Sequence, residues 1–236
     1  MIRKLLIVFA SAAILCVATL GGIWLFAGKS IEKQVAEGGD WNWTFGDDED
    51  EGPRKTRSFT IDPAVQLAME IPVDLTFTRG DAPSMTVEGP ANVVDRLTWE
   101  GGHLALPGTA HMRHGLKVRI TAPEITGLDL DAPANVTLTG LDQDAFTLNG
   151  SGAVNLEASG KLRKVNVSTD GAGHIDLSKV DGEDATVRVD GAGDVTLGAT
   201  NLVDVHINGV GHVSLVKKPK TLRTQINGIG SVDHDY

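Results

Sequence analysis

The sequence predicts an all-β fold, a parallel β-helix or β-solenoid with coils of 18–21 residues, preceded by an N-terminal transmembrane helix. Three observations support this prediction. A glycine-containing motif recurs through the second half of the 236-residue chain, apolar and polar residues alternate in the segments before it, and an uncharged run stands near the N-terminus. Period-two alternation is typical of strands with one buried face, and a constant repeat length is typical of stacked coils.

The uncharged run, residues 5–27, is long enough to cross a membrane. As a helix its 23 residues reach roughly 34 Å, whereas a hydrocarbon core is about 30 Å thick. Arg3 and Lys4 precede the run, which favours a cytoplasmic N-terminus. We expect residues 1–28 to be a single-pass anchor in a bacterial inner membrane, with the C-terminal domain in the periplasm. A cleaved signal sequence and a secreted product are the alternative; a lipoprotein at Cys16 is disfavoured by the bulky Leu15 before it.

Residues 29–57 are predicted to be an acidic flexible linker. Five adjacent acidic residues at 47–51 are followed by a basic cluster at 54–57, and such a sequence has no apolar face to bury. Trp41, Trp43 and Phe45 alternate with polar residues. This pattern fits either a juxtamembrane segment or a motif that docks a partner.

The domain itself is predicted to span residues 58–236. Its first part has alternating segments at 58–61, 73–78, 84–88 and 116–121, separated by glycine and proline, and one helical turn within 90–99. The repeats then start at residues 132, 150, 171, 191, 209 and 228, each with G-x-G or its Ala132 variant. An Asp or Asn precedes each start. The predicted corner residues are Asn149, Gly150, Asp170, Gly171, Asp190, Gly191, Asn208, Gly209, Asn227 and Gly228.

These Asx-Gly steps explain how the chain turns. Asx and Gly tolerate left-handed φ, and glycine also lets neighbouring backbones approach closely. One repeat cannot bury its apolar residues alone, so the repeats are expected to stack about 4.8 Å apart around one core. Val154, Ile175, Val195 and Val213 should then lie one above another. A Greek-key sandwich does not predict this regular spacing, and the varying position of the acid after G-x-G does not match a calcium-binding nonapeptide repeat.

Stacking also predicts columns of outward side chains. One column should contain Asn135, Ala153, His174, Asp194, His212 and Ser231, and the next Thr137, Asn155, Asp176, Thr196, Ser214 and Asp233. His174, Asp194 and His212 are thus candidate ligands for zinc or another divalent cation. A solvated polar ladder explains the same residues, and we expect no metal or other cofactor.

Composition limits the functions that the domain can have. A net charge of −10 argues against binding to nucleic acid, and a single cysteine excludes an internal disulfide framework. No G-x-S-x-G, P-loop or H-E-x-x-H motif is present. Asp170 and Asp190 stack as a possible carboxylate pair, but a turn-forming role explains both. We therefore expect no catalytic residues.

The segments 59–88 and 116–130, followed by the G-x-G-x-V repeats, resemble the head GIN domain family, whose label is "putative autotransporter adhesin". The resemblance covers roughly residues 58–236. It implies an exported β-helical domain in a bacterial envelope and supplies no catalytic motif. The chain departs from an autotransporter because no C-terminal membrane barrel is evident and because the predicted anchor lies at the inner membrane.

We accordingly expect a non-catalytic, membrane-anchored interaction or structural module of the cell envelope. Its partner would be an envelope protein or a glycan, its membrane contact would run through residues 5–27, and no nucleic acid would be bound. Two alternatives are a polysaccharide-acting enzyme of the β-helix type and a module that senses envelope stress.

Overall fold

The computed structural model describes residues 53–236 except 65, 109–111 and 113. The predicted anchor and almost all of the predicted linker lie outside the described residues. Within the described part of the chain, no helix has the length and apolar character needed to cross a membrane.

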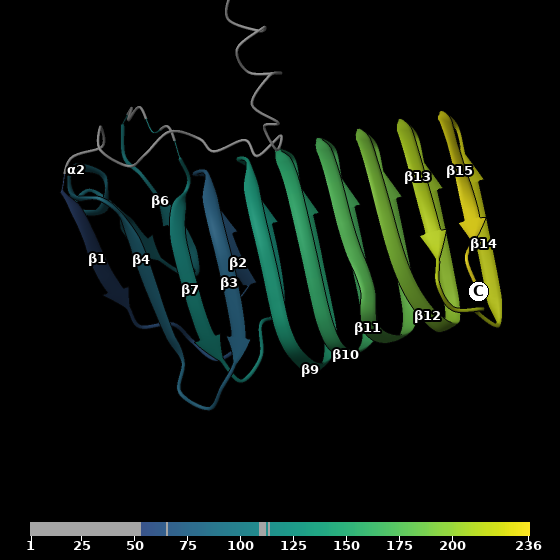
Figure 1. Ribbon diagram of the computed structural model, residues 1–236, viewed down its shortest axis with the longest axis horizontal. Helices are drawn as coiled ribbons and strands as arrows, with labels where there is room; N and C mark the ends of the chain where they lie inside the picture. The colour runs from purple at the N-terminus through teal and green to yellow at the C-terminus, as the bar shows by residue number, and fades with distance from the viewer. Residues whose placement is uncertain (1–52, 65, 109–111, 113) are drawn as a thin grey trace, which may run out of the picture. The chain divides into compact units, whose positions relative to one another are not determined.

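All strands of the described residues belong to one 15-stranded sheet that winds around a common interior (Figure 1). One short helix accompanies them in this part of the chain, within the segment where a helical turn was predicted. The elements are β1 (Arg54–Phe59), β2 (Gln66–Met69), β3 (Val73–Arg79), β4 (Ser84–Pro90), α2 (Ala91–Val94), β5 (Thr98–Glu100), β6 (His103–Ala105), β7 (Leu116–Ala122), β8 (Gly127–Leu130), β9 (Ala134–Gly150), β10 (Ala153–Thr169), β11 (Ala172–Val189), β12 (Ala192–Ile207), β13 (Val210–Leu215), β14 (Thr221–Ile226) and β15 (Ile229–His234).

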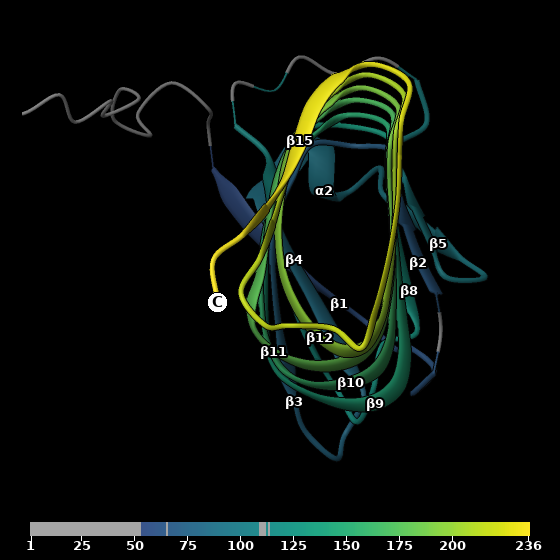
Figure 2. The same ribbon diagram turned by 90° about the vertical axis from the view of Figure 1, so that its right-hand side faces the viewer.

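The C-terminal part is a parallel β-solenoid, as predicted. Strands β9 to β12 have 16–18 residues each, and each bends around a corner, so that one strand crosses both faces of the solenoid. On one face the order is β3-β9-β10-β11-β12-β13-β15, and on the other β2-β8-β9-β10-β11-β12-β14. Viewed along the axis, the coils superimpose as one elongated loop (Figure 2).

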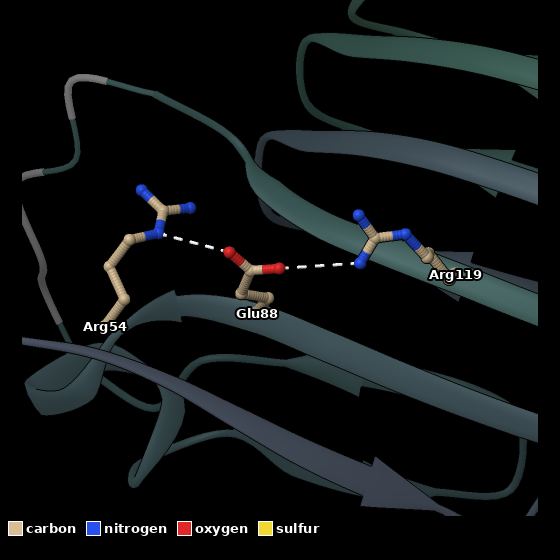
Figure 3. Close-up of polar contacts among 3 residues, drawn as sticks. All are labelled: Arg54, Glu88 and Arg119. Atoms are coloured by element: carbon tan, nitrogen blue, oxygen red, sulfur yellow. Dashed lines mark hydrogen bonds and ion pairs between the residues drawn. The ribbon is translucent and has the colours of Figure 1, made fainter. Parts of the chain in front are cut away.

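The N-terminal end of the solenoid is closed by antiparallel strands. β1 pairs with β4 and β4 with β7, while β7 runs parallel to β3. Helix α2 buries Val93 and Val94 beside them. The Glu88 carboxylate accepts hydrogen bonds from Arg54 Nε at 3.3 Å and from Arg119 Nη1 at 3.4 Å, which ties β1, β4 and β7 together (Figure 3).

The basic cluster at 54–57 therefore belongs to the domain, although it was predicted to be linker. Lys55 pairs with Asp95, and Arg57 donates a hydrogen bond to the Leu97 carbonyl at 2.8 Å. The Arg57 guanidinium also lies 4.7 Å from the ring centroid of Phe59. Asp95 and Leu97 each lie 40 residues from their partners along the chain, so the local charge pattern could not predict these contacts.

The interior consists of apolar columns that run along the solenoid axis. Ile175, Val195 and Val213 lie one above another, as predicted. Val154 does not join them: it pairs with Gly173, and Leu156 lies beside Ile175 instead. The offset is two residues, and because the side-chain period of a strand is two, every valine and leucine of β10 still points inward.

Candidate functional site

The Asx-Gly corners form one edge of the solenoid. Bends between strands lie at Asp170-Gly171, Asp190-Gly191, Asn208-Gly209 and Asn227-Gly228. The structure does not place a corner at Asn149 and Gly150, where one was predicted. Both residues lie within β9, and the corner of that coil is Ser151-Gly152. This displacement of the corner is the reason for the two-residue offset of β10.

Left-handed backbone conformation is not the reason for these glycines. Among the described residues, positive φ occurs only at Gly101, Gly102, Gly108, Gly140 and Gly160. The corner glycines are needed for close stacking instead, because a Cβ on Gly191 would collide with the Gly171 carbonyl oxygen. The same collision with the preceding corner is met at Gly171, Gly209 and Gly228.

The polar residues that precede these glycines form a hydrogen-bonded ladder. Asn208 Nδ2 donates to Asp190 Oδ1 at 2.5 Å, and Asn227 Nδ2 donates to Asn208 Oδ1 at 3.0 Å. Ser151 Oγ donates to Asp131 Oδ1 at 2.8 Å. Asn149 lies outside the ladder, since its side chain donates to Asp129 on β8.

Asp190 does not fit the role of a catalytic acid in a pair with Asp170. The hydrogen bond from Asn208 lowers the pKa of the Asp190 carboxyl, and Arg188 adds to this effect by donating from Nε at 2.6 Å. A general acid at neutral pH needs a raised pKa. The ladder is therefore a structural feature of the corner.

One face of the solenoid carries two outward columns of polar side chains, and we call this surface the polar face. It covers β1, β4, β7, β3 and the first halves of β9 to β12, and then β13 and β15. The first column contains Thr56, Glu88, Lys117, Asp74, Asn135, Asn155, His174, Asp194, His212 and Ser231. The second contains Ser58, Thr86, Arg119, Thr76, Thr137, Glu157, Asp176, Thr196, Ser214 and Asp233. Asn155 and Glu157 stand where Ala153 and Asn155 were predicted, because of the same two-residue offset.

His174, Asp194 and His212 lie on successive strands, as predicted, but they do not form a metal site. His212 Nδ1 is 2.9 Å from Ser231 Oγ and 3.8 Å from Asp233 Oδ2, so its ring contacts β15. Over the described ranges, no three His, Cys, Asp or Glu side chains come close enough together to hold a metal ion. The arrangement is that of a polar ladder.

The opposite edge of the solenoid, where β9 to β12 bend, carries a shallow groove of about 530 Å³ that we call the charged corner. Side chains of opposite sign alternate from coil to coil, since Lys161 is in register with Asp142 on one side and Asp181 on the other. Three ion pairs cross the coils: Arg79–Asp142 at 2.7 Å, Arg163–Asp144 at 2.7 Å and Lys217–Asp181 at 2.5 Å. The sequence analysis missed this groove, although alternating charge at one offset of the repeat is visible in the sequence.

The charged corner is poorly suited to acid catalysis. A hydrogen bond from Arg163 lowers the pKa of Asp144, and one from Lys217 lowers the pKa of Asp181. Hydrolysis of a glycosidic bond by paired carboxyl groups needs one of them protonated at working pH. These two carboxylates instead stay ionised and occupied by cationic side chains.

Comparison with solved structures supports the fold. A crystal structure described as a putative adhesin from Bacteroides fragilis is 16% identical and superimposes with a TM-score of 0.61, covering 77% of this chain and 97% of the other. Two structures from Parabacteroides distasonis, described as a putative adhesin and a putative lipid binding protein, are 16% and 18% identical. Each alignment covers 78% of this chain and 97% of the other. The TM-scores are 0.46 and 0.40, which are too low to support an argument about this chain.

No protein with a curated function matches the chain in sequence. A family model does match it, over residues 66–219, and its description is "Putative auto-transporter adhesin, head GIN domain". The match includes β2 to β13 and thus most of the solenoid. The resemblance noted in the sequence is confirmed, and the chain belongs to the head GIN domain family.

Proposed function

We propose that the chain is a non-catalytic interaction module of the bacterial cell envelope and that it binds an envelope protein or a glycan through the polar face. The observation that carries this proposal is the continuity of the two polar columns from β1 to β15. Every position in them has a side chain that donates or accepts hydrogen bonds, and all of these side chains are at least partly exposed except that of Ser214, which is buried and donates to Asp235. The family's description as an adhesin head domain supports a binding role.

The geometry of the polar face suits a partner that makes many weak contacts. Neighbouring strands of a sheet lie about 4.8 Å apart, so the columns offer hydrogen-bonding groups at a regular interval. Most of these side chains are short, such as Thr137, Asn155 and Ser231, and short side chains lose little conformational entropy when a partner orders them. A polymer with repeating hydroxyl or amide groups has the matching chemistry.

The proposal includes anchoring at the inner membrane through residues 5–27, with the solenoid in the periplasm. Arg3 and Lys4 before an uncharged run of this length support that orientation. Protease added to spheroplasts should then degrade the solenoid and leave a short membrane-bound fragment. A solenoid recovered intact in the culture medium would contradict anchoring and favour the cleaved signal sequence.

Site-specific photo-crosslinking in cells tests the polar face directly. A photoreactive amino acid is placed at Asn155 or at His174, which are exposed on the polar face. The matched control is Thr186, which is exposed on the opposite face at the level of the same coils. We expect one recurrent crosslinked product from the first two positions and none from the third.

The same product from all three positions, or no product from Asn155 and His174, would contradict the proposal. If the product is a protein, mass spectrometry identifies it. If it is a glycan, the product loses its added mass on digestion with lysozyme or another glycan hydrolase.

A further inference from the structure

The C-terminal end of the solenoid has open strand edges. Within the described residues, β14 pairs only with β12 and β15 only with β13. The two strands lie on opposite faces and form the near end of the solenoid in Figure 2. An unpaired edge presents backbone N–H and C=O groups to another strand.

Exposed apolar side chains gather toward this end. The large apolar residues that are exposed among those described are Val210, Ile226, Ile229 and Tyr236, at 57%, 39%, 77% and 53%. All of them follow residue 209. Ile226 stands at an inward position whose equivalents in earlier coils, Ile207 and Val189, are fully covered. Val210 and Ile229 stand at a corner position that is also exposed in earlier coils, but there it is occupied by alanine. Exposure of this kind marks a surface that a partner covers.

The end is self-complementary in its geometry. Thr224 and Val232 stand four residues before and four residues after the corner at Gly228, so they face each other across the interior. Both point inward, because they pair with the buried Val205 and Val213. A two-fold axis perpendicular to both faces can run just outside the open end, level with these two residues. It places β14 against β14 and β15 against β15 of a second copy, antiparallel in both cases.

In this register the side chains that meet are compatible. On β14, Leu222 lies opposite Ile226 of the second copy, and Arg223 lies opposite Gln225. On β15, Gly230 lies opposite His234 of the second copy and leaves room for its ring. Ser231 lies opposite Asp233. No like charges stand directly opposite each other, which is the arrangement that would destabilise a strand pair.

We infer that the solenoid forms a two-fold, end-to-end homodimer through β14 and β15. The inference goes beyond the proposed function and does not rest on it. The two strands supply six residues each, fewer than the roughly 20–30 per side of a standard interface, so the dimer is weak and depends on concentration. The axis keeps both polar faces on the same side, so the dimer joins them into one longer surface.

Disulfide crosslinking tests the register. In a full-length Cys16→Ser background, Thr224→Cys places two thiols next to each other across the axis, and we expect a covalent dimer on mild oxidation. Thr221→Cys is the matched control on the same edge strand. It lies about 20 Å from its own counterpart in this register, since six residues of strand separate them, and should give no dimer.

Sedimentation of the same full-length protein in detergent tests the equilibrium. Thr224→Glu places two carboxylates face to face and should raise the dimer dissociation constant tenfold or more, whereas Thr221→Glu should leave it unchanged. Thr224 is exposed in one copy, so neither variant should change the melting temperature.

Three results would overturn the inference. The first is a monomer at all concentrations up to about 100 µM, which is far above the range expected for a micromolar interface. The second is equal crosslinking at both cysteine positions. The third is an oligomer that Thr224→Glu does not weaken, which would place the association outside β14 and β15.

Discussion

Thr169 is a polar residue in the apolar interior of the solenoid. It is 1% exposed, and its hydroxyl has no hydrogen-bond partner among the described residues. It lies in one column with Gly150 and Val189, on the neighbouring strands. Val189 shows that a β-branched apolar side chain of this size fits the column, and the hydroxyl of Thr169 adds the cost of an unpaired buried group.

Thr169→Val should therefore stabilise the protein. We expect a gain of about 1 kcal/mol, since an unsatisfied buried hydroxyl costs roughly 1–3 kcal/mol. In a domain of this size that raises the melting temperature by about 2–4 °C. Thermal unfolding measures the change, with Thr186→Val on the exposed face as the neutral control. A loss of stability in Thr169→Val would show that the hydroxyl has a partner, such as a buried water.

At Gly191, in contrast to Thr169, there is no space for any side chain. Gly191→Ala places a methyl group against the carbonyl oxygen of Gly171, which is backbone and cannot rotate away. We expect a loss of about 3 kcal/mol, at the upper end of overpacking costs. Urea denaturation measures it, and Ala192→Ser at the exposed neighbouring position is the control. A loss below about 0.5 kcal/mol, within the range of neutral surface changes, would mean that the coils can separate at this corner.

At the scale of elements, ion pairs and hydrogen bonds between coils hold neighbouring strands in register. The charged corner links β3 to β9, β9 to β10, and β11 to the segment after β13. The corner ladder links the corner before β12 to the corner after it, through the hydrogen bond from Asn208 to Asp190. Both features place an acidic side chain next to its partner on another coil, and both lower the pKa of that acid.

Stability should consequently fall in acid. The folded-state pKa values of Asp144, Asp181 and Asp190 lie below their ordinary value of 3.8. The unfolded chain therefore binds protons more readily, and the stabilisation is present above about pH 4 and is lost as the pH falls through the folded-state values. Melting temperatures should stay level between pH 7 and 5 and decrease below about pH 4.

The variant Asp144→Asn should show a weaker decrease below pH 4 than the parent protein, because one of the responding carboxyl groups is gone. Thr200→Asn, which replaces one uncharged side chain of the same groove with another, serves as the control. Its melting temperature should depend on pH as that of the parent protein does. An identical acid response in Asp144→Asn and the parent would exclude Asp144 from the effect.

At the scale of the whole molecule, the two ends of the solenoid differ. The N-terminal end is covered by β1, β4 and α2, and the Arg54–Glu88–Arg119 contact fastens the antiparallel strands there. The C-terminal end keeps the parallel arrangement of the coils up to β14 and β15. Among the described residues, one end is thus closed by antiparallel strands, and the other carries the strand edges to which we assign the second copy.

The sequence by itself determined the parallel solenoid, the inward or outward direction of the side chains, and the positions of the four corners from Asp170-Gly171 to Asn227-Gly228. These follow from local periods, two residues for a strand and 18–21 for a coil, and both periods are written along the chain. It also placed His174, Asp194 and His212 on successive coils, because their offsets from the corner glycines agree.

The tertiary structure alone decided which residue of one coil lies beside which residue of the next. A shift of two residues keeps every side chain on its face, so periodicity did not distinguish Val154 from Leu156 as the neighbour of Ile175. The position of the corner at Ser151-Gly152, the inclusion of Arg54–Phe59 in the sheet and the ion pairs of the charged corner depend on contacts between distant segments. Such contacts form only when the coils pack, since close backbone stacking and charge pairing between coils have no counterpart in the isolated repeat.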